Sequence, residues 1–180
     1  HRLVPTQEKI LGKIASECMP QIYQLFIKPM NKDFSQDIFE TSLIQARKFI
    51  EEIYMDDEVL FVCSMSSKTI VYKGLMLPNA IKEFYIDLNQ ENFKASTCVF
   101  HQRFSTNTSP RWHLAQPFRL LAHNGEINAI RGNRNWVKAR SSKFLTPFIP
   151  KIQKFKQLVN ETGSDSSSLD NMIELLVKGG

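Results

Sequence analysis

The spacing of apolar residues along the chain constrains its fold more than any other feature of the sequence. In the middle of the chain, apolar side chains occur at every second position or in short runs, which is typical of β-strands. Toward both ends they recur at helical spacing. This order favours the α+β class over a regular alternation of strands and helices. The 180 residues are enough for one domain with a substantial core.

The same pattern predicts the individual elements. We expect helices over residues 6–18, 33–54, 126–138, 151–158 and from Asp165 onward, the last one capped by Ser164. We expect strands over residues 21–27, 59–65, 69–72, 84–88, 97–101 and 118–123, with 97–101 buried.

The net charge of +5 is unevenly distributed, because residues 101–143 hold eight Lys and Arg against the single Glu126. Six of the eight are arginines, whose planar fork suits carboxylate or phosphate: Arg103, Arg111, Arg119, Arg131, Arg134 and Arg140. Charge alone leaves three readings open, namely a nucleic-acid surface, a site for a small anion, or a solvated face.

Other features exclude whole classes of protein. Cys18, Cys63 and Cys98 are odd in number and widely spaced, which argues against a disulfide scaffold or a standard zinc module and suits a reducing compartment. The sequence contains no apolar run long enough for a membrane span and no secretory signal pattern, so we expect no membrane partner and no metal. Because the chain starts at His1 and stops at Gly180, we expect a piece of a longer polypeptide.

Three short motifs carry the candidate chemistry. Arg103, followed by hydroxyl and amide side chains to residue 108, is either a carboxylate clamp or an arginine paired with a core acid. Asn124 and Gly125 offer two neutral donors suited to an oxyanion, although Asn-Gly also forms hairpin turns. Asp165 is either part of a helix cap or a fixed carboxylate for an ammonium group.

Together these motifs complement an α-amino acid whose side chain contains a carbonyl group under attack. A nucleophile is missing from this set, because no cysteine lies beside a histidine at a telling position. His101 and His123 lie on or beside apolar segments, so we expect them to be core histidines with satisfied hydrogen bonds.

The segments VFHQRFSTNT, LAQPFRLLAHNGEINAIRGNRNW and NETGSDSSSLDN closely resemble the glutaminase domain of the glutamate synthase large (alpha) subunit, a class II glutamine amidotransferase. The resemblance covers nearly the whole chain and is weakest over residues 28–58. It implies part of one amidotransferase domain over residues 1–180, with a partial αββα four-layer sandwich of the N-terminal-nucleophile hydrolase type. It also implies that the first strand and hairpin of that sandwich are missing.

The resemblance also implies residue roles. Arg103 would bind the α-carboxylate of glutamine, Thr106 would line the pocket, and Asp165 would bind the α-amino group. Asn124 and Gly125 would form the oxyanion hole. The nucleophile of the family is an N-terminal cysteine, which none of Cys18, Cys63 and Cys98 matches, so we expect this piece to be inactive alone.

In the family, ammonia from glutamine passes to a synthase domain that aminates 2-oxoglutarate. The resemblance therefore implies no cofactor in this segment, and FMN, an iron–sulfur cluster and NADPH or ferredoxin in the complete protein. The implied partners are glutamine, the synthase domain and a small NADPH-oxidising subunit, in a bacterial cytoplasm or a plastid stroma. Two alternatives are a catalytically dead homologue that binds an amino acid, and a nucleic-acid-binding module.

Overall fold

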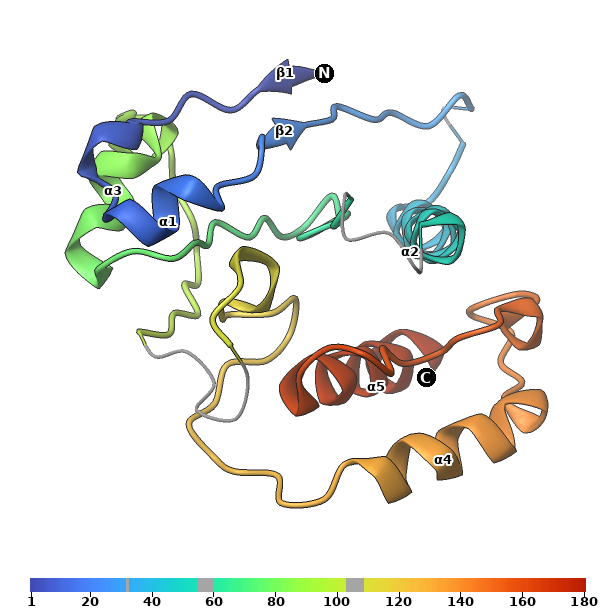
Figure 1. The fold of residues 1–180 in the computed structure, drawn as a ribbon. Helices are drawn as coiled ribbons and strands as arrows, with labels where there is room; N and C mark the ends of the chain where they lie inside the picture. Colours follow the sequence, from blue (N-terminus) through green and yellow to red (C-terminus); the bar gives the residue numbers. More distant parts are fainter. Residues whose placement is uncertain (32, 55–59, 103–108) are drawn as a thin grey trace.

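The computed structural model describes residues 1–31, 33–54, 60–102 and 109–180. Figure 1 shows the N-terminal part of the chain, which includes the small sheet, at the top of the view and the C-terminal part at the bottom. The elements are β1 (Arg2–Leu3), α1 (Lys13–Glu17), β2 (Tyr23–Gln24), α2 (Gln36–Ile53), α3 (Ile81–Phe84), α4 (Arg131–Arg140) and α5 (Asp165–Gly179). Short 3-10 turns cover Glu8–Ile10, Pro78–Ala80, Ile86–Asn89, Trp112–Leu114, Ser141–Lys143 and Ile152–Lys154.

The sheet joins the N-terminus to the segment after α1. The strands β1 and β2 pair antiparallel, with Leu3 opposite Tyr23, and the Val4 amide continues the pairing by donating to the Ile22 carbonyl at 2.8 Å. An isolated bridge between Thr6 and Tyr85 ties the same N-terminal segment to the end of α3. The first residues of the chain are therefore anchored at two places.

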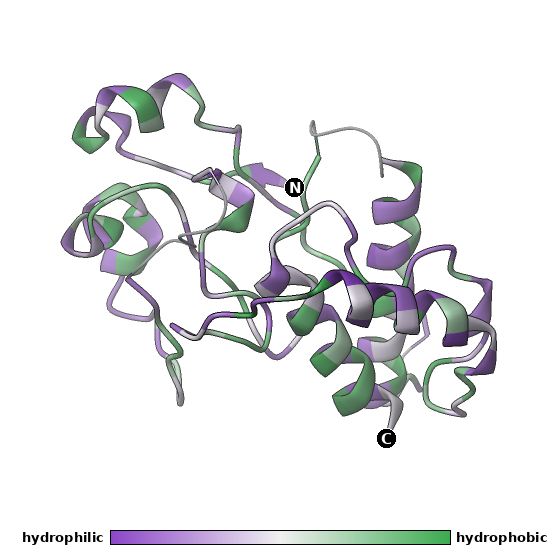
Figure 2. Cartoon of the chain, turned by 60° about the horizontal axis from the view of Figure 1, so that its bottom comes forward, coloured by the Kyte–Doolittle hydropathy of each residue, from purple (hydrophilic) through white to green (hydrophobic). Residues whose placement is uncertain are grey.

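Two apolar clusters form the core. The first is centred on Phe84 and Trp112, whose ring centroids lie 5.7 Å apart, together with the buried Val4 and Tyr85. The second lies at the C-terminal end and consists of Ile149, Ile152, Leu158 and Leu175. Hydrophobic and hydrophilic residues alternate along the helices in Figure 2, as expected for helices with one buried face.

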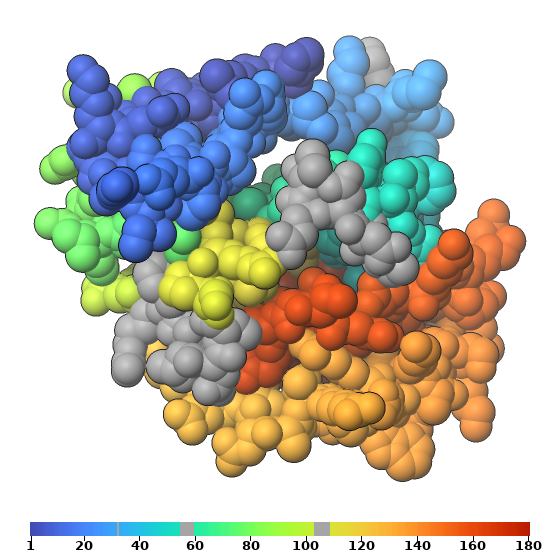
Figure 3. Space-filling view, viewed as in Figure 1, coloured from blue at the N-terminus to red at the C-terminus, as the bar shows by residue number. Residues whose placement is uncertain are grey.

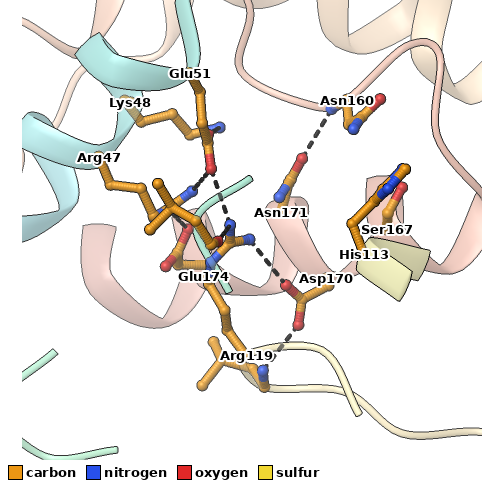
Figure 4. Close-up of polar contacts among 12 residues, drawn as sticks. Arg47, Lys48, Glu51, His113, Arg119, Asn160, Ser167, Asp170, Asn171 and Glu174 are labelled. Carbon is orange, nitrogen blue, oxygen red and sulfur yellow. Dashed lines mark hydrogen bonds and ion pairs between the residues drawn. The ribbon is translucent and has the colours of Figure 1, made fainter. Parts of the chain in front are cut away.

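Between α2 and α5, a network of buried charges holds the segment that precedes residue 123. Arg119 donates to Glu51 of α2 at 2.8 Å and forms an ion pair with Asp170 of α5 at 3.5 Å (Figure 4). Asp170 also accepts a hydrogen bond from the Leu120 amide at 2.8 Å. Arg47 pairs with Glu51 and with Glu174, so α2, α5 and residues 119–120 are locked together.

This network shifts the ionisation of its members. Burial alone would raise the pKa of Glu51, but the neighbouring Arg47, Lys48 and Arg119 lower that pKa below its ordinary value. Burial lowers the pKa of Lys48 to about 8, and its ammonium group donates to the Leu158 carbonyl at 2.8 Å.

The two long helices agree with the sequence prediction. The predicted helix over 33–54 is α2, which begins after the cap Ser35, and the predicted C-terminal helix is α5. Ser164 caps α5 by accepting a hydrogen bond from the Ser167 amide at 3.1 Å. Both helices have strong periodicity and a serine cap, so their formation depends on local sequence.

Three other predicted helices are shorter than expected. The helix expected over 6–18 is divided into a 3-10 turn and α1, with Gly12 as the N-cap residue of α1. The helix expected over 126–138 begins only at Arg131, and the one expected over 151–158 is reduced to the turn Ile152–Lys154.

Most of the predicted strands do not form in the described part of the chain. The strand expected over 21–27 is reduced to Tyr23–Gln24, and the one expected over 84–88 is the end of α3 followed by the turn Ile86–Asn89. The described parts of 59–65, 69–72, 97–101 and 118–123 are irregular, and Phe100, predicted to be buried, is 72% exposed. A strand requires a hydrogen-bonded neighbour, which a local sequence pattern does not specify.

The described residues contain both helices and a small sheet, as a mixed class requires. The layers of a four-layer sandwich are not formed among them. None of the helices in this part of the chain combines the length and the apolar character that a membrane crossing requires.

Candidate active site

The start of α5 places Asp165 beside a cavity. Asp165 is the first residue of the helix, and its Oδ1 accepts hydrogen bonds from the Ser166 amide at 2.6 Å and from the Ser166 hydroxyl at 3.1 Å. The cavity has a volume of about 480 Å³ and is lined by Glu126, Ile127, Asn128, Ile130, Arg134, Gly163, Ser164 and Asp165. The helix dipole places partial positive charge at this end of α5, which favours a carboxylate side chain at the position of Asp165.

The turn before Asp165 is built around Asn160. The Asn160 side-chain Oδ1 accepts hydrogen bonds from the backbone amides of Thr162 and Gly163 at 2.9 and 2.6 Å. The Asn160 backbone amide donates to Asn171 Oδ1 of α5 at 2.8 Å. At Gly163, a β-carbon would lie 2.6 Å from the Ser167 hydroxyl and 2.9 Å from the Asn160 side-chain nitrogen. Only glycine therefore fits this turn without displacing the hydrogen bonds that shape it.

Arg134 of α4 holds the same turn from the other side. Its Nη2 donates to the carbonyls of Gly163 and Ser164 at 2.8 and 3.2 Å, and its Nε donates to the Ser168 hydroxyl at 2.9 Å. In Figure 3 the segment that includes α4 lies directly against α5, in agreement with these contacts.

The Asn124-Gly125 pair lies in an exposed, irregular segment, neither in a hairpin nor at the start of a helix. The residue before it is held tightly, because the His123 amide donates to Gln116 Oε1 at 2.9 Å and the His123 carbonyl accepts from Gln116 Nε2 at 3.2 Å. His101 Nε2 also contacts that carbonyl at 2.9 Å. A β-carbon on Gly125 would lie 3.3 Å from His123 Nδ1, so the imidazole lies close against the glycine.

The His123 imidazole links this segment to Asp165. Its Nε2 lies 2.8 Å from the Ser166 hydroxyl oxygen, and that hydroxyl donates to Asp165 Oδ1. A chain of hydrogen bonds thus runs from His123 through Ser166 to Asp165.

The structure brings together two of the three predicted motifs and the beginning of the other. Asp165 and the segment that carries Asn124 and Gly125 meet through His123 and Ser166. His101, two residues before Arg103, contacts His123. Arg103 and Thr106 themselves lie outside the described residues.

A second cavity, with a volume of about 600 Å³, lies on another side of the Asn160–Ser164 turn. Its lining includes Lys48, His113, Arg119, Ser167 and Asn171, and Figure 4 shows the side chains that lie around it. Gly163 contributes to the walls of both cavities, so this turn separates them.

The three cysteines line neither cavity. Cys18 and Cys98 are exposed, and burial raises the pKa of the Cys63 thiol despite the opposing effect of Lys73. Among the described residues, no group of three or more His, Cys, Asp or Glu is placed to hold a metal ion.

The sequence predicts a substrate-binding role for Asp165 and only a core position for His123, and the structure joins the two residues through Ser166. Both histidines are half-buried and hydrogen-bonded, as expected, yet neither is on a strand of the described structure. The sequence alone predicts no role for four residues, because they have partners in other segments: Gln116, Arg134, Asn160 and Ser166. The only local signal was their occurrence within or beside the polar motifs of residues 114–136 and 160–171.

Comparison with known proteins identifies the family to which the chain is similar. The family model for class-II glutamine amidotransferases matches residues 1–180. Ferredoxin-dependent glutamate synthase from Oryza sativa subsp. japonica is 43% identical over 184 residues, which cover 99% of this chain and 11% of that protein. The large chain of NADPH glutamate synthase from Azospirillum brasilense is 41% identical, over 99% of this chain and 12% of that protein.

A third relative, NADH glutamate synthase from Saccharomyces cerevisiae, is 40% identical over 99% of this chain and 9% of its own length. The chain thus spans about a tenth of the length of these relatives. With the family model matched from the first residue to the last, the chain belongs to the class-II glutamine amidotransferases.

Proposed function

We propose that this chain is part of the glutaminase domain of a glutamate synthase and supplies its glutamine-binding pocket and oxyanion hole. The observation that carries the proposal is the hydrogen-bonded chain from His123 to Asp165 beside a cavity of about 480 Å³. It connects a carboxylate suited to an ammonium group with the Asn124-Gly125 segment.

In this proposal each residue binds one part of glutamine. Asp165 binds the α-ammonium, Arg103 binds the α-carboxylate with its planar fork, and Thr106 lines the pocket. Asn124 and Gly125 donate neutral hydrogen bonds to the oxygen of the amide under attack, where negative charge develops in the transition state.

The proposed nucleophile is an N-terminal cysteine outside these 180 residues. Its thiolate attacks the amide carbon of glutamine, the carbon–nitrogen bond breaks, and the nitrogen leaves as ammonia after taking up a proton. Water then hydrolyses the glutamyl thioester to glutamate and regenerates the thiol. No cysteine of this sequence lines the cavity next to Asp165.

The synthase reaction is assigned to other parts of the complete polypeptide. Iron–sulfur clusters need several cysteine thiolates close together, whereas Cys18 and Cys98 are exposed and no ligand cluster is present among the described residues. We therefore place the iron–sulfur cluster outside this segment, and we propose the same for FMN and for the site for NADPH or ferredoxin. The proposed partners are the synthase domain, which receives the ammonia, and a small NADPH-oxidising subunit.

The four-layer αββα sandwich and the location belong to the same proposal. Residues 59–65, 69–72, 97–101 and 118–123 are the segments proposed to form strands when further chain lies beside them. The proposed location is a bacterial cytoplasm or a plastid stroma, and the proposal includes neither a nucleic acid nor a membrane.

The test is ammonia release from L-glutamine by the complete polypeptide that contains this sequence. We expect Asp165→Asn and Arg103→Ala each to lower kcat/KM by about 30-fold or more, because losing a charged contact to substrate costs roughly 2–5 kcal/mol. The control is Glu161→Gln, which removes a carboxylate four residues earlier. Full activity in the Asp165 and Arg103 variants would refute the site, and saturable glutamine binding without ammonia release would favour a catalytically dead homologue.

A further inference from the structure

The proposed ammonium site depends on where the turn before α5 is held. The contacts of Asp165 are local, since its Oδ1 accepts only from Ser166 among the described residues. Asn160 ties the turn to α5 itself, through Asn171 and through the Ser168 hydroxyl, which donates to the Asn160 carbonyl at 2.5 Å. These bonds shape the turn, but they do not fix it relative to the opposite wall of the cavity.

Arg134 connects the turn to α4, on the other side of the cavity. It is the residue of α4 that lines the cavity, and its fork makes three hydrogen bonds across to Gly163, Ser164 and Ser168. Its donors are directed at two carbonyls and a hydroxyl, so the planar guanidinium holds the turn in place. The Asp165 carboxylate stays available for the substrate ammonium. The two carbonyls belong to the two residues immediately before Asp165.

We propose that Arg134 is a positioning residue that sets Asp165 at the distance from α4 that the substrate ammonium requires. The inference rests on the proposed function, because it assumes that Asp165 binds that ammonium. Arg134 acts through the Gly163–Ser164 backbone and touches no reacting atom. Loss of its fork should therefore weaken recognition of the α-amino group and leave the chemistry at the amide intact.

The chain offers a matched control on the same helix. Lys138 lies one turn after Arg134 and also contacts the turn, with its Nζ 3.8 Å from Glu161, but this ion pair is exposed. Lys138→Gln removes one positive charge from α4 without touching the backbone next to Asp165. Arg134→Lys keeps the charge and replaces the planar fork with a flexible ammonium.

The experiment compares two substrates in the complete polypeptide: L-glutamine and 4-carbamoylbutanoate, which is glutamine without its α-amino group. We expect Arg134→Lys and Arg134→Gln to lower kcat/KM for L-glutamine about tenfold or more, mainly through KM, a change that corresponds to roughly 1.4 kcal/mol. Neither variant should change kcat/KM for 4-carbamoylbutanoate, and Lys138→Gln should match the wild type on both substrates. Combined with Asp165→Asn, the Arg134 variants should add no further loss.

The outcomes separate the two proposals. An equal loss on both substrates would show a general structural role for Arg134 and overturn the inference, as would unchanged kinetics in both Arg134 variants. If the wild type fails to prefer L-glutamine, or if Asp165→Asn leaves that preference intact, the assignment of Asp165 fails and the inference fails with it. If Arg134→Gln does not fold, Arg134→Lys provides the comparison, and a folded Arg134→Lys with wild-type preference refutes the positioning role.

Discussion

At the scale of single residues, His123 and Ser166 show how a polar chain can join distant motifs. His123 Nε2 and the Ser166 hydroxyl lie 2.8 Å apart, across 43 residues of sequence. Because the Ser166 hydroxyl donates a hydrogen bond to Asp165 and contacts His123, the serine both orients the imidazole and stabilises the carboxylate. Removing the hydroxyl would leave His123 without this partner and would leave the Asp165 carboxylate with the Ser166 backbone amide as its hydrogen-bond donor.

We predict that Ser166→Ala in the complete polypeptide raises KM for L-glutamine several-fold with little change in kcat. The loss of a buried hydrogen bond and the unsatisfied imidazole should cost about 1–2 kcal/mol. The matched control is Ser167→Ala, because Ser167 is also buried and its hydroxyl donates to the Ser164 carbonyl at 2.7 Å, away from Asp165. Similar KM increases in the two variants, measured by steady-state ammonia release, would contradict a specific role for Ser166.

Residue types in motifs are the basis of the predicted site. Asp165 and the Asn124-Gly125 pair were identified because a carboxylate, an amide and a glycine each suggest a limited set of roles. Arg134 and Asn160 were not, because their contacts depend on how α4 and the turn before α5 meet. That meeting is a tertiary feature without a local sequence signal, and the assignments of Arg103, Thr106, Asn124, Gly125 and Asp165 themselves remain predictions.

At the scale of elements, the network between α2 and α5 is the support on which the candidate site is built. Asp170 is fully buried and holds both the Arg119 guanidinium and the Leu120 amide. Residues 119–120 lead directly to His123, so the position of that imidazole depends on α5 twice, through Asp170 and through Ser166.

We predict that Asp170→Asn loosens this part of the structure. Arg119 would keep Glu51 as an ionic partner but lose Asp170, and breaking a buried ion pair typically costs about 3 kcal/mol. Hydrogen exchange of the complete polypeptide should show a corresponding fall in the opening free energy of the amides in α5 and at Leu120. The control is Glu17→Gln in the exposed Lys13–Glu17 pair, where the change should stay below about 0.5 kcal/mol. Unchanged exchange in the Asp170 variant would mean that the network does not hold these elements.

Elements whose formation is local were predicted, and those that need a distant partner were not. Both α2 and α5 have a serine cap and an apolar stripe, and each begins within three residues of its predicted start. The predicted strands around Val99 and Leu121 have the residue types of strands but lack paired neighbours among the described residues. The apolar residues at those positions therefore favour burial, but the local sequence does not specify the segment against which they would pack.

At the scale of the whole molecule, many large apolar side chains of the described residues are exposed. The segment after β2 exposes Phe26 and Met30 at 70% and 105%, and Phe100 is exposed at 72%. The strand β2 pairs only with β1 in the described structure, so its other edge offers unpaired backbone groups. The relatives are roughly ten times longer than this chain.

We predict that the isolated 180-residue chain binds a hydrophobic dye such as ANS and associates at micromolar concentration, because large exposed apolar patches drive association. In the complete polypeptide the amides of residues 23–30 and 97–101 should exchange more slowly than in the isolated chain. The variant Phe26→Lys combined with Phe100→Lys should reduce dye binding and association of the isolated chain, whereas the control Lys9→Gln on the exposed N-terminal turn should not. A monomeric, dye-free isolated chain with equal exchange at both segments would show that these surfaces need no cover. In that case, the apolar segments 21–27 and 97–101 would not need a neighbouring strand from further chain.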